Sequence, residues 1–325
     1  MWQRFYAVAC NTFVETIRQP IFGVILLVTA AALILNVSLA AFTLDDGDKL
    51  LLDLGLNTLL LSGLFLSAFS ASGVLSREIE NKTVLTVISK PISRPLFILG
   101  KFAGLVAALI LAFYLCNLVF ILAQRHGVLQ NTTDPWDAPV LALGFGSLAL
   151  AGIGAAFYNY FYGKHFATTT IAFETVLLTL ATLIVAVLDE SWEVIPFGSN
   201  LVGGQVLVAA FLVLLVVILT AAVALAASTR LGPLMTLVTC TGFLGLGLIS
   251  DYAFGQRAET SRISAVVYHV VPNIGPFSVI DGLYAESEKT LVPPRYVGLV
   301  SAYAALLTVG ILSVAIAAFQ TREVG

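Results

Sequence analysis

Residues 76–101 read SREIENKTVLTVISKPISRPLFILGK, and they separate two long apolar runs at residues 51–75 and 96–122. About 20 apolar residues are enough to cross a bilayer as an α-helix, at about 1.5 Å per residue. Both flanking runs reach that length. The stretch is therefore expected to be a loop between two membrane spans, and its basic side chains predict that it faces the cytoplasm.

The composition of the whole chain is that of an integral membrane protein. Of its 325 residues, 59% are apolar and only 11% are charged, against about 45–50% and about 25% in soluble domains. The net charge of -3, with no basic run interleaved with aromatic residues, excludes nucleic acid as a partner. Cys10, Cys116 and Cys240 lie far apart without a CxxC spacing, so we expect buried side chains and no metal site.

Apolar runs of spanning length occur eight times. They cover about residues 20–42, 51–75, 96–122, 138–160, 166–188, 205–227, 231–250 and 296–319. The predicted fold class is an all-α polytopic helical bundle that forms one transmembrane domain over residues 1–325. A six-span alternative stays open if residues 158–165 form an interfacial kink and residues 189–200 a re-entrant turn.

The N-terminal residues 1–19 predict an amphipathic helix that lies along the membrane surface before Pro20. On a helical wheel one face is mostly aromatic and apolar, and the other is polar. The first face holds Trp2, Phe5, Tyr6, Ala9, Phe13 and Ile17, and the second holds Arg4, Asn11, Glu15 and Arg18. A cleaved signal peptide is the alternative, but the first apolar run has full spanning length, which argues against it.

The distribution of Lys and Arg predicts which side each loop faces. An even number of spans places both termini on one side, and a cytoplasmic N-terminus puts ten of the 16 basic residues inside. These are Arg4, Arg18, Arg77, Lys82, Lys90, Arg94, Lys101, Lys164, Arg230 and Arg322. Residues 251–295 then lie outside, and the apolar patch at 263–271 predicts an amphipathic or re-entrant helix that serves the architecture rather than a substrate gate.

The loop at residues 76–95 carries the signals of a short helix. Ser76 is suited to cap a helix over residues 77–89, and Glu78 precedes Lys82 by four residues. Val84, Leu85, Val87 and Ile88 are too apolar for a solvated loop, so we expect this helix to press on its own bundle or on another protein. The simpler interpretation is a charged intracellular loop that fixes the topology.

This order of residues, REIENKT followed by the SKPISR turn and FILGK, resembles the signature of the type-2 ABC transporter permeases, the transmembrane subunits of ABC exporters. The N-terminal helix with Glu15 and Arg18 resembles the elbow helix of that family. The segment AASTRLGP at 226–233 is similar to its later cytoplasmic turn, and the Pro272-Asn273 segment and the ending FQTRE at 319–323 also fit. Many members have six spans, so the extra pair near residues 138–188 departs from the family.

The resemblance implies a permease of the bacterial inner membrane that works as a homodimer or heterodimer above two cytoplasmic ABC ATPase subunits. In the family, the helix after the second span is the coupling element that docks on the ATPase. The matching residues are Arg77, Glu78, Glu80, Asn81, Lys82 and Thr83, with Lys90 and Arg94 flanking them. The chain would be no enzyme, and ATP with its magnesium would bind the partner ATPase. It lacks a GxxxxGK[ST] phosphate loop, as such a subunit should.

Glu174 is the only acidic residue well inside a predicted span, and such carboxylates are functional candidates by default. With Thr168, Thr175, Thr179 and Thr182 it forms a polar stripe, of which Glu174, Thr175 and Thr179 would line a pathway. The alternative is a structural carboxylate paired between helices. A carrier driven by an ion gradient, with Glu174 as its proton site, is therefore the rival function. An intramembrane enzyme is a third, for which the sequence offers no nucleophile–base pair.

Overall fold

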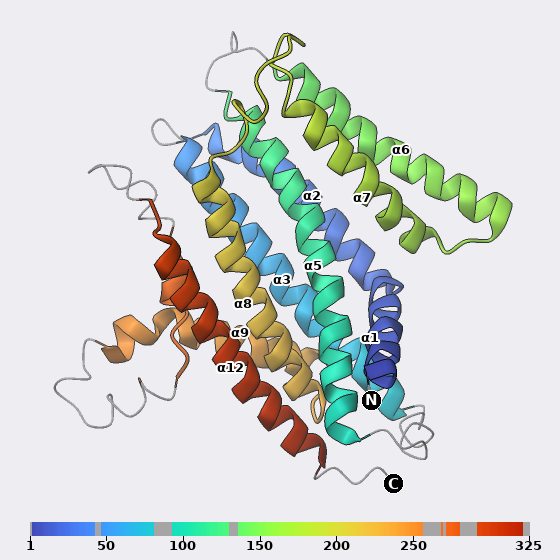
Figure 1. Ribbon diagram of the computed structural model, residues 1–325, viewed down its shortest axis with the longest axis vertical. Coiled ribbons are helices and arrows are strands. Elements are labelled where there is room, and N and C mark those ends of the chain that lie inside the picture. The colour runs from blue at the N-terminus through green and yellow to red at the C-terminus, as the bar shows by residue number, and fades with distance from the viewer. Residues whose placement is uncertain are drawn as a thin grey trace. The chain divides into compact units, whose positions relative to one another are not determined.

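The computed structural model describes residues 2–42, 47–80, 93–129, 136–255, 268, 271–279 and 291–320, except for the side chains of residues 75–80. Within these ranges the chain is helical and forms no β-strand (Figure 1). The elements are α1 (Trp2–Ile17), α2 (Pro20–Ala40), α3 (Gly47–Glu80), α5 (Arg94–His126), α6 (Ala138–Tyr162), α7 (Phe166–Val185), α8 (Gly204–Ser228), α9 (Pro233–Ser250), η1 (Asp251–Gly255), η2 (Gly275–Phe277) and α12 (Pro294–Gln320).

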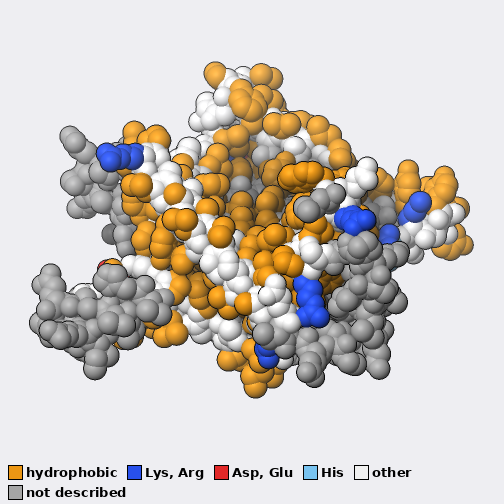
Figure 2. All heavy atoms as spheres, turned by 60° about the horizontal axis from the view of Figure 1, so that its bottom comes forward, with side chains coloured by type: hydrophobic (Ala, Val, Ile, Leu, Met, Phe, Trp, Pro, Cys, Tyr) orange, Lys and Arg blue, Asp and Glu red, His pale blue; other side chains and the backbone are white. Residues whose placement is uncertain are grey.

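Eight helices in the described part of the chain are long and apolar enough to cross a membrane. They are α2, α3, α5, α6, α7, α8, α9 with η1, and α12, and they coincide with the eight apolar runs of the sequence. The prediction of an all-α, multi-pass membrane protein is therefore confirmed. Figure 2 shows the corresponding surface, where hydrophobic side chains dominate the described part of the face in view.

The joint between α6 and α7 decides between eight spans and six. Helix α6 ends at Tyr162, Gly163 follows in the left-handed conformation with φ 62°, and α7 begins at Phe166. The two helices run side by side as a hairpin (Figure 1). The Phe173 ring of α7 packs closely on Gly154 of α6, because a Cβ at Gly154 would lie only 2.9 Å from that ring. The interfacial kink that six spans would need is therefore absent at this joint.

The end of α3 differs from the sequence expectation. We expected the second span to end near residue 75 and a separate helix to begin at Ser76, but α3 continues through Ser76 to Glu80. An N-cap supplies acceptors for the first N–H groups of a helix, which have no partner within the helix. Ser76 lies inside the continuous helix α3, where the N–H groups that follow it bond to carbonyls of the preceding turn, so Ser76 is not an N-cap. The predicted helix start is wrong, and residues 81–89 of the helix predicted over 77–89 lie outside the described residues.

The chain divides into two compact units. The first unit comprises Met1–Gln19, Gly63–Ile110 and Phe211–Gly325, and the second comprises Pro20–Ser62 and Leu111–Ala210. The division falls within α3, α5 and α8, so each unit holds part of these helices. The first unit contains the amphipathic helix α1 and the start of α5, while the second contains the α6–α7 hairpin and Glu174.

The described part of the predicted outer segment packs on the first unit. The backbone N–H of Ile274 donates to the carbonyl of Gly247 in α9 at 3.0 Å, and Tyr296 in α12 donates from its hydroxyl to the Pro276 carbonyl at 2.7 Å. Ile274 and Phe277 are buried. These contacts fit an architectural role, whereas the helix predicted at 263–271 falls almost entirely outside the described residues.

Candidate functional site

Helix α1 lies against the first turns of α5 through two glycines. A Cβ on Gly100 would come within 2.8 Å of the Val8 side chain, and one on Gly104 would come within 2.2 Å of the Ala9 backbone oxygen. The spacing of four residues puts both glycines on one face of α5. Rows of this kind let helix backbones approach closely where apolar burial gives no drive to associate. The sequence GKFAG therefore brings α1 to the start of α5.

A buried charge pair lies within the same contact. The Lys101 ammonium is 3.6 Å from a Glu15 carboxylate oxygen, and the side chains are 1% and 26% exposed. The ammonium also lies 5.6 Å from the centroid of the Phe97 ring. Burying a charge is costly unless an opposite charge compensates it. The buried Lys101 ammonium therefore stabilises the position of α1 that brings Glu15 within reach.

Two arginines hold the C-terminal end of α12 in the same unit. Arg94, the first residue of α5, donates to the carbonyl of Gln320 at 2.7 Å, and Arg230 donates to the carbonyl of Ala318 at 3.2 Å. The last carbonyls of a helix lack partners within the helix, and cationic donors both satisfy them and complement the helix dipole. The start of α5 and the end of α12 thus lie at one end of the first unit.

An apolar cluster backs these polar contacts. The rings of Phe97 and Phe319 stack with their centroids 5.8 Å apart. The buried members come from α5, α8 and α12, and they are Phe97, Ile98, Ala222, Leu225, Leu312, Ala315 and Phe319. The first turns of α5 are consequently fixed by α1, α8 and α12 together.

The predicted coupling residues are only partly placed by this arrangement. Arg94 contacts the end of α12, as described above. Arg77, Glu78 and Glu80 belong to the last turn of α3, and their side chains are not described. Asn81, Lys82, Thr83 and Lys90 lie outside the described residues. Their role in coupling therefore stays a prediction.

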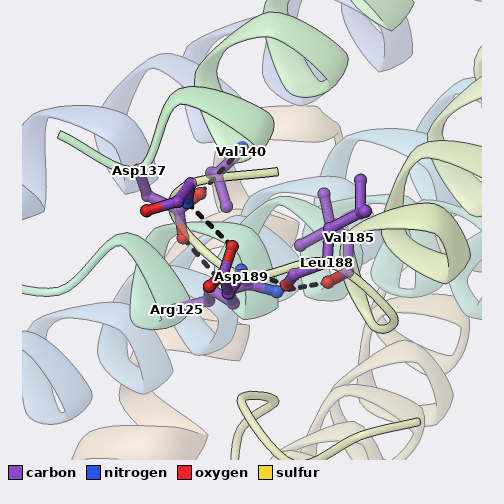
Figure 3. Close-up of polar contacts among 7 residues, drawn as sticks. Arg125, Asp137, Val140, Val185, Leu188 and Asp189 are labelled. Atoms are coloured by element: carbon purple, nitrogen blue, oxygen red, sulfur yellow. Dashed lines mark hydrogen bonds and ion pairs between the residues drawn. The ribbon is translucent and has the colours of Figure 1, made fainter. Parts of the chain in front are cut away.

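The second unit contains a separate polar cluster centred on Arg125 (Figure 3). Its guanidinium donates to Asp137 at 3.0 Å, to the carbonyl of Leu188 at 2.7 Å and to the carbonyl of Val185. Asp137 in turn caps α6, because its other carboxylate oxygen accepts from the N–H of Val140 at 3.1 Å. One arginine thus ties the end of α5 to the start of α6 and the end of α7.

Glu174 lines a cavity of about 640 Å³ within the second unit. The cavity is bounded by α2, α5, α6 and α7, and its wall is otherwise apolar except for Thr170 and Cys116. Among the residues that the structure describes, the Glu174 carboxylate has no hydrogen bond or ion pair. The structural pairing considered as an alternative is thus not found in the described ranges.

The threonines expected beside Glu174 have other surroundings. Thr175 and Thr179 do not line that cavity. The Thr175 hydroxyl donates to the carbonyl of Ile171 at 2.7 Å, and the Thr179 hydroxyl contacts the hydroxyl of Tyr114 at 2.8 Å. The structure therefore brings Glu174 to the cavity without these two threonines, and Thr170 takes their place on the wall.

Two of these features were missed by sequence reasoning. In the sequence, Lys101 and Arg125 were used only as basic residues that indicate which side of the membrane a segment faces. In the structure both side chains are buried and paired with a carboxylate. A signal for Arg125 was available in Asp137, since Asp-Ala-Pro is a common helix start that can also hold a nearby cation. For Lys101 the GxxxG spacing around it marked a packed helix face.

No protein-family model and no curated protein matches this sequence. The fold and the geometry above define a multi-pass helical membrane protein.

Proposed function

We propose that this protein is the transmembrane permease subunit of an ABC exporter of the type-2 class, driven by ATP that a separate cytoplasmic ATPase hydrolyses. The substrate crosses the membrane through the spans, and the chain itself binds no nucleotide. A second permease subunit completes the transporter. The proposal rests on the resemblance of residues 76–101 to the coupling motif of that class.

One structural observation supports it most strongly. Helix α1, the expected elbow helix, is joined to the first turns of α5 by the Lys101–Glu15 pair and by the close contact at Gly104. The predicted coupling segment, residues 76–95, leads directly into α5. A force on that segment would reach α5 first and would pass to α1 and to the end of α12 through these contacts.

This arrangement suits a subunit that receives mechanical work at its cytoplasmic end. Closure of the ATPases on ATP would displace the coupling segment, and α5 would move with it as a rigid helix. Because α5 continues from the first unit into the second, its displacement would extend to the region that holds Glu174.

The test is a charge reversal on the predicted docking surface. We expect Glu78→Lys with Glu80→Lys to release an ATPase that co-purifies with the wild-type chain, since both carboxylates would face the partner. Glu190→Lys with Glu193→Lys is the matched control, because these exposed residues lie in a loop predicted to face outside. The control should keep the ATPase bound. Retention of a fully active ATPase by the Glu78/Glu80 variant would overturn the docking assignment.

A carrier driven by an ion gradient is the second candidate, and the cavity position of Glu174 is the observation that favours it. A carrier would continue to transport after ATP depletion and would stop when Glu174 becomes Gln. The permease predicts that transport stops after ATP depletion, and this result separates the two candidates.

A further inference from the structure

A smaller cavity of about 250 Å³ adjoins the one that Glu174 lines, also within the second unit. The two share four wall residues, Ile34, Val119, Leu148 and Leu178. Together they extend from Pro20 at the start of α2 to Ser38 near its end, roughly 27 Å along the helix at 1.5 Å per residue. The two adjacent cavities together thus reach along most of α2.

The two cavities differ in the walls at their far ends. The larger cavity begins at Pro20 and Phe166, the first residues of α2 and α7, and the smaller one ends at His126 and Trp136. Exposed aromatic side chains that include Tyr160, Phe161 and Tyr162 cluster just before α7, as at a membrane–water interface. This end of the larger cavity therefore lies close to a predicted membrane surface.

The walls of the two cavities carry one acidic side chain. Glu174 is the only carboxylate on either described wall, and no Lys or Arg lines either cavity. Arg125, the basic residue held near the end of α5, is already bound by Asp137 and two carbonyls. A carboxylate in apolar surroundings is expensive unless a cation compensates it, and here the described wall supplies none.

We propose that the two adjacent cavities form one binding site for an organic cation with one positive charge and an elongated apolar body. The charged group sits at Glu174, and the apolar body extends past Ile34 and Leu178 toward Trp136. An anion would be repelled by the carboxylate, and a neutral apolar molecule would leave that charge uncompensated. The wall thus selects both features of the ligand.

The proposal concerns binding, which is independent of the energy source. The identification of this ligand as the transported substrate rests on the proposed transport function. The binding test below uses the purified chain without any ATPase, so a failure of the exporter assignment would leave its outcome unchanged.

The test is photoaffinity labelling of the purified protein in phosphatidylcholine nanodiscs. The probe is an alkyltrimethylammonium with a diazirine near the end of its chain, and dodecyltrimethylammonium and dodecanol are the charged and neutral competitors. We expect labelled peptides from the cavity walls of α2, α5, α6 or α7, with displacement by the cation and not by the alcohol. Labelling spread over all spans, or equal displacement by both competitors, would show that lipid-like apolar binding is all that occurs.

Two variants separate the charge from the space. Glu174→Gln should raise the concentration of cation for half displacement at least about tenfold, while Glu174→Asp keeps most of the affinity. Unchanged displacement in Glu174→Gln would refute the role of the carboxylate. Each variant is first compared with the wild type by gel filtration, so that loss of fold is recognised.

Two glycines of α6 test whether the ligand occupies the cavity. Gly152 lies on the cavity wall, and Gly146 on the same helix does not; a Cβ at either position meets nothing within 4 Å. Leucine should therefore be accommodated at both. Gly152→Leu should abolish the specific labelling and Gly146→Leu should leave it intact. Equal labelling of the two variants would contradict a ligand in this cavity.

Discussion

The Lys101 ammonium in α5 lies 3.6 Å from the Glu15 carboxylate in α1, and the two side chains differ sharply in exposure, at 1% and 26%. The pair is thus buried on the α5 side and reached by solvent on the α1 side. Loss of the carboxylate leaves a charge inside the protein, whereas loss of the ammonium leaves one that water can reach. The contribution of each partner to stability should therefore be unequal.

We predict that Glu15→Gln lowers the free energy of unfolding by about 3 kcal/mol, as the loss of a partner from a buried pair does. Lys101→Met should cost only about 1 kcal/mol, because the remaining carboxylate is hydrated. Titration with SDS in mixed micelles measures both. In a double-mutant cycle the combined variant should resemble Lys101→Met. Simple addition of the two single effects would contradict a direct interaction.

The close approach of α1 to α5 predicts that Gly104→Ala is destabilising. The new Cβ would lie 2.2 Å from the Ala9 backbone oxygen, so α1 must shift, at a cost of about 1–3 kcal/mol. Hydrogen exchange of the α1 amides should accelerate in this variant. Gly242→Ala is the control in the same unit, since a Cβ at that position has open space. Equal exchange in the two variants would rule out the packed contact.

The Arg125 cluster predicts a graded loss of stability in the second unit. Arg125→Met strands the buried Asp137 carboxylate and two carbonyls, and should cost about 3–5 kcal/mol. Asp137→Asn keeps one carbonyl oxygen for the α6 cap but loses the oxygen that accepts from the guanidinium, which still donates to the carbonyls of Val185 and Leu188, so its loss should be smaller. Titration with SDS in mixed micelles measures the free energy of unfolding of both variants and shows which of them loses more stability. A larger loss in Asp137→Asn than in Arg125→Met would contradict this assignment.

The eight-span topology predicts opposite labelling at two exposed positions. A cysteine replacing Glu190 should react with an impermeant thiol reagent added outside intact cells, and one replacing Lys164 should be shielded. Both residues are exposed, so reactivity reports the side of the membrane rather than burial. The native Cys10 is exposed in α1 and is first replaced by Ser to clear the background. The reverse pattern of labelling would overturn the predicted sidedness.

The number and the approximate positions of the spans were predictable because a bilayer imposes one length and one composition on every crossing helix. Boundaries were less certain where polar residues continue a helix beyond the apolar run. Helix α5 extends to His126 because Arg125 is satisfied inside the protein. Helix α3 extends to Glu80 through residues that were expected to begin a separate helix.

The candidate sites were predictable only in part. Glu174 could be found because a carboxylate in a span is rare, but its cavity arises from four helices that no local pattern brings together. Thr175 and Thr179 were placed in one stripe with Glu174, yet at 3.6 residues per turn they point about 100° and about 140° away from it, and they contact Ile171 and Tyr114. The pairing of Lys101 with Glu15 depends on the path of α1, which the amphipathic pattern alone does not determine.

The central claim is that residues 76–95 dock on an ATPase, and site-specific cross-linking tests it most directly. A photoreactive amino acid in place of Thr83 should capture in intact cells a chain that contains a GxxxxGK[ST] phosphate loop, as identified by mass spectrometry. The same amino acid in place of Glu190 should capture no such chain. Failure at Thr83 in a cell that makes functional transporter, or equal capture from both positions, would contradict the account.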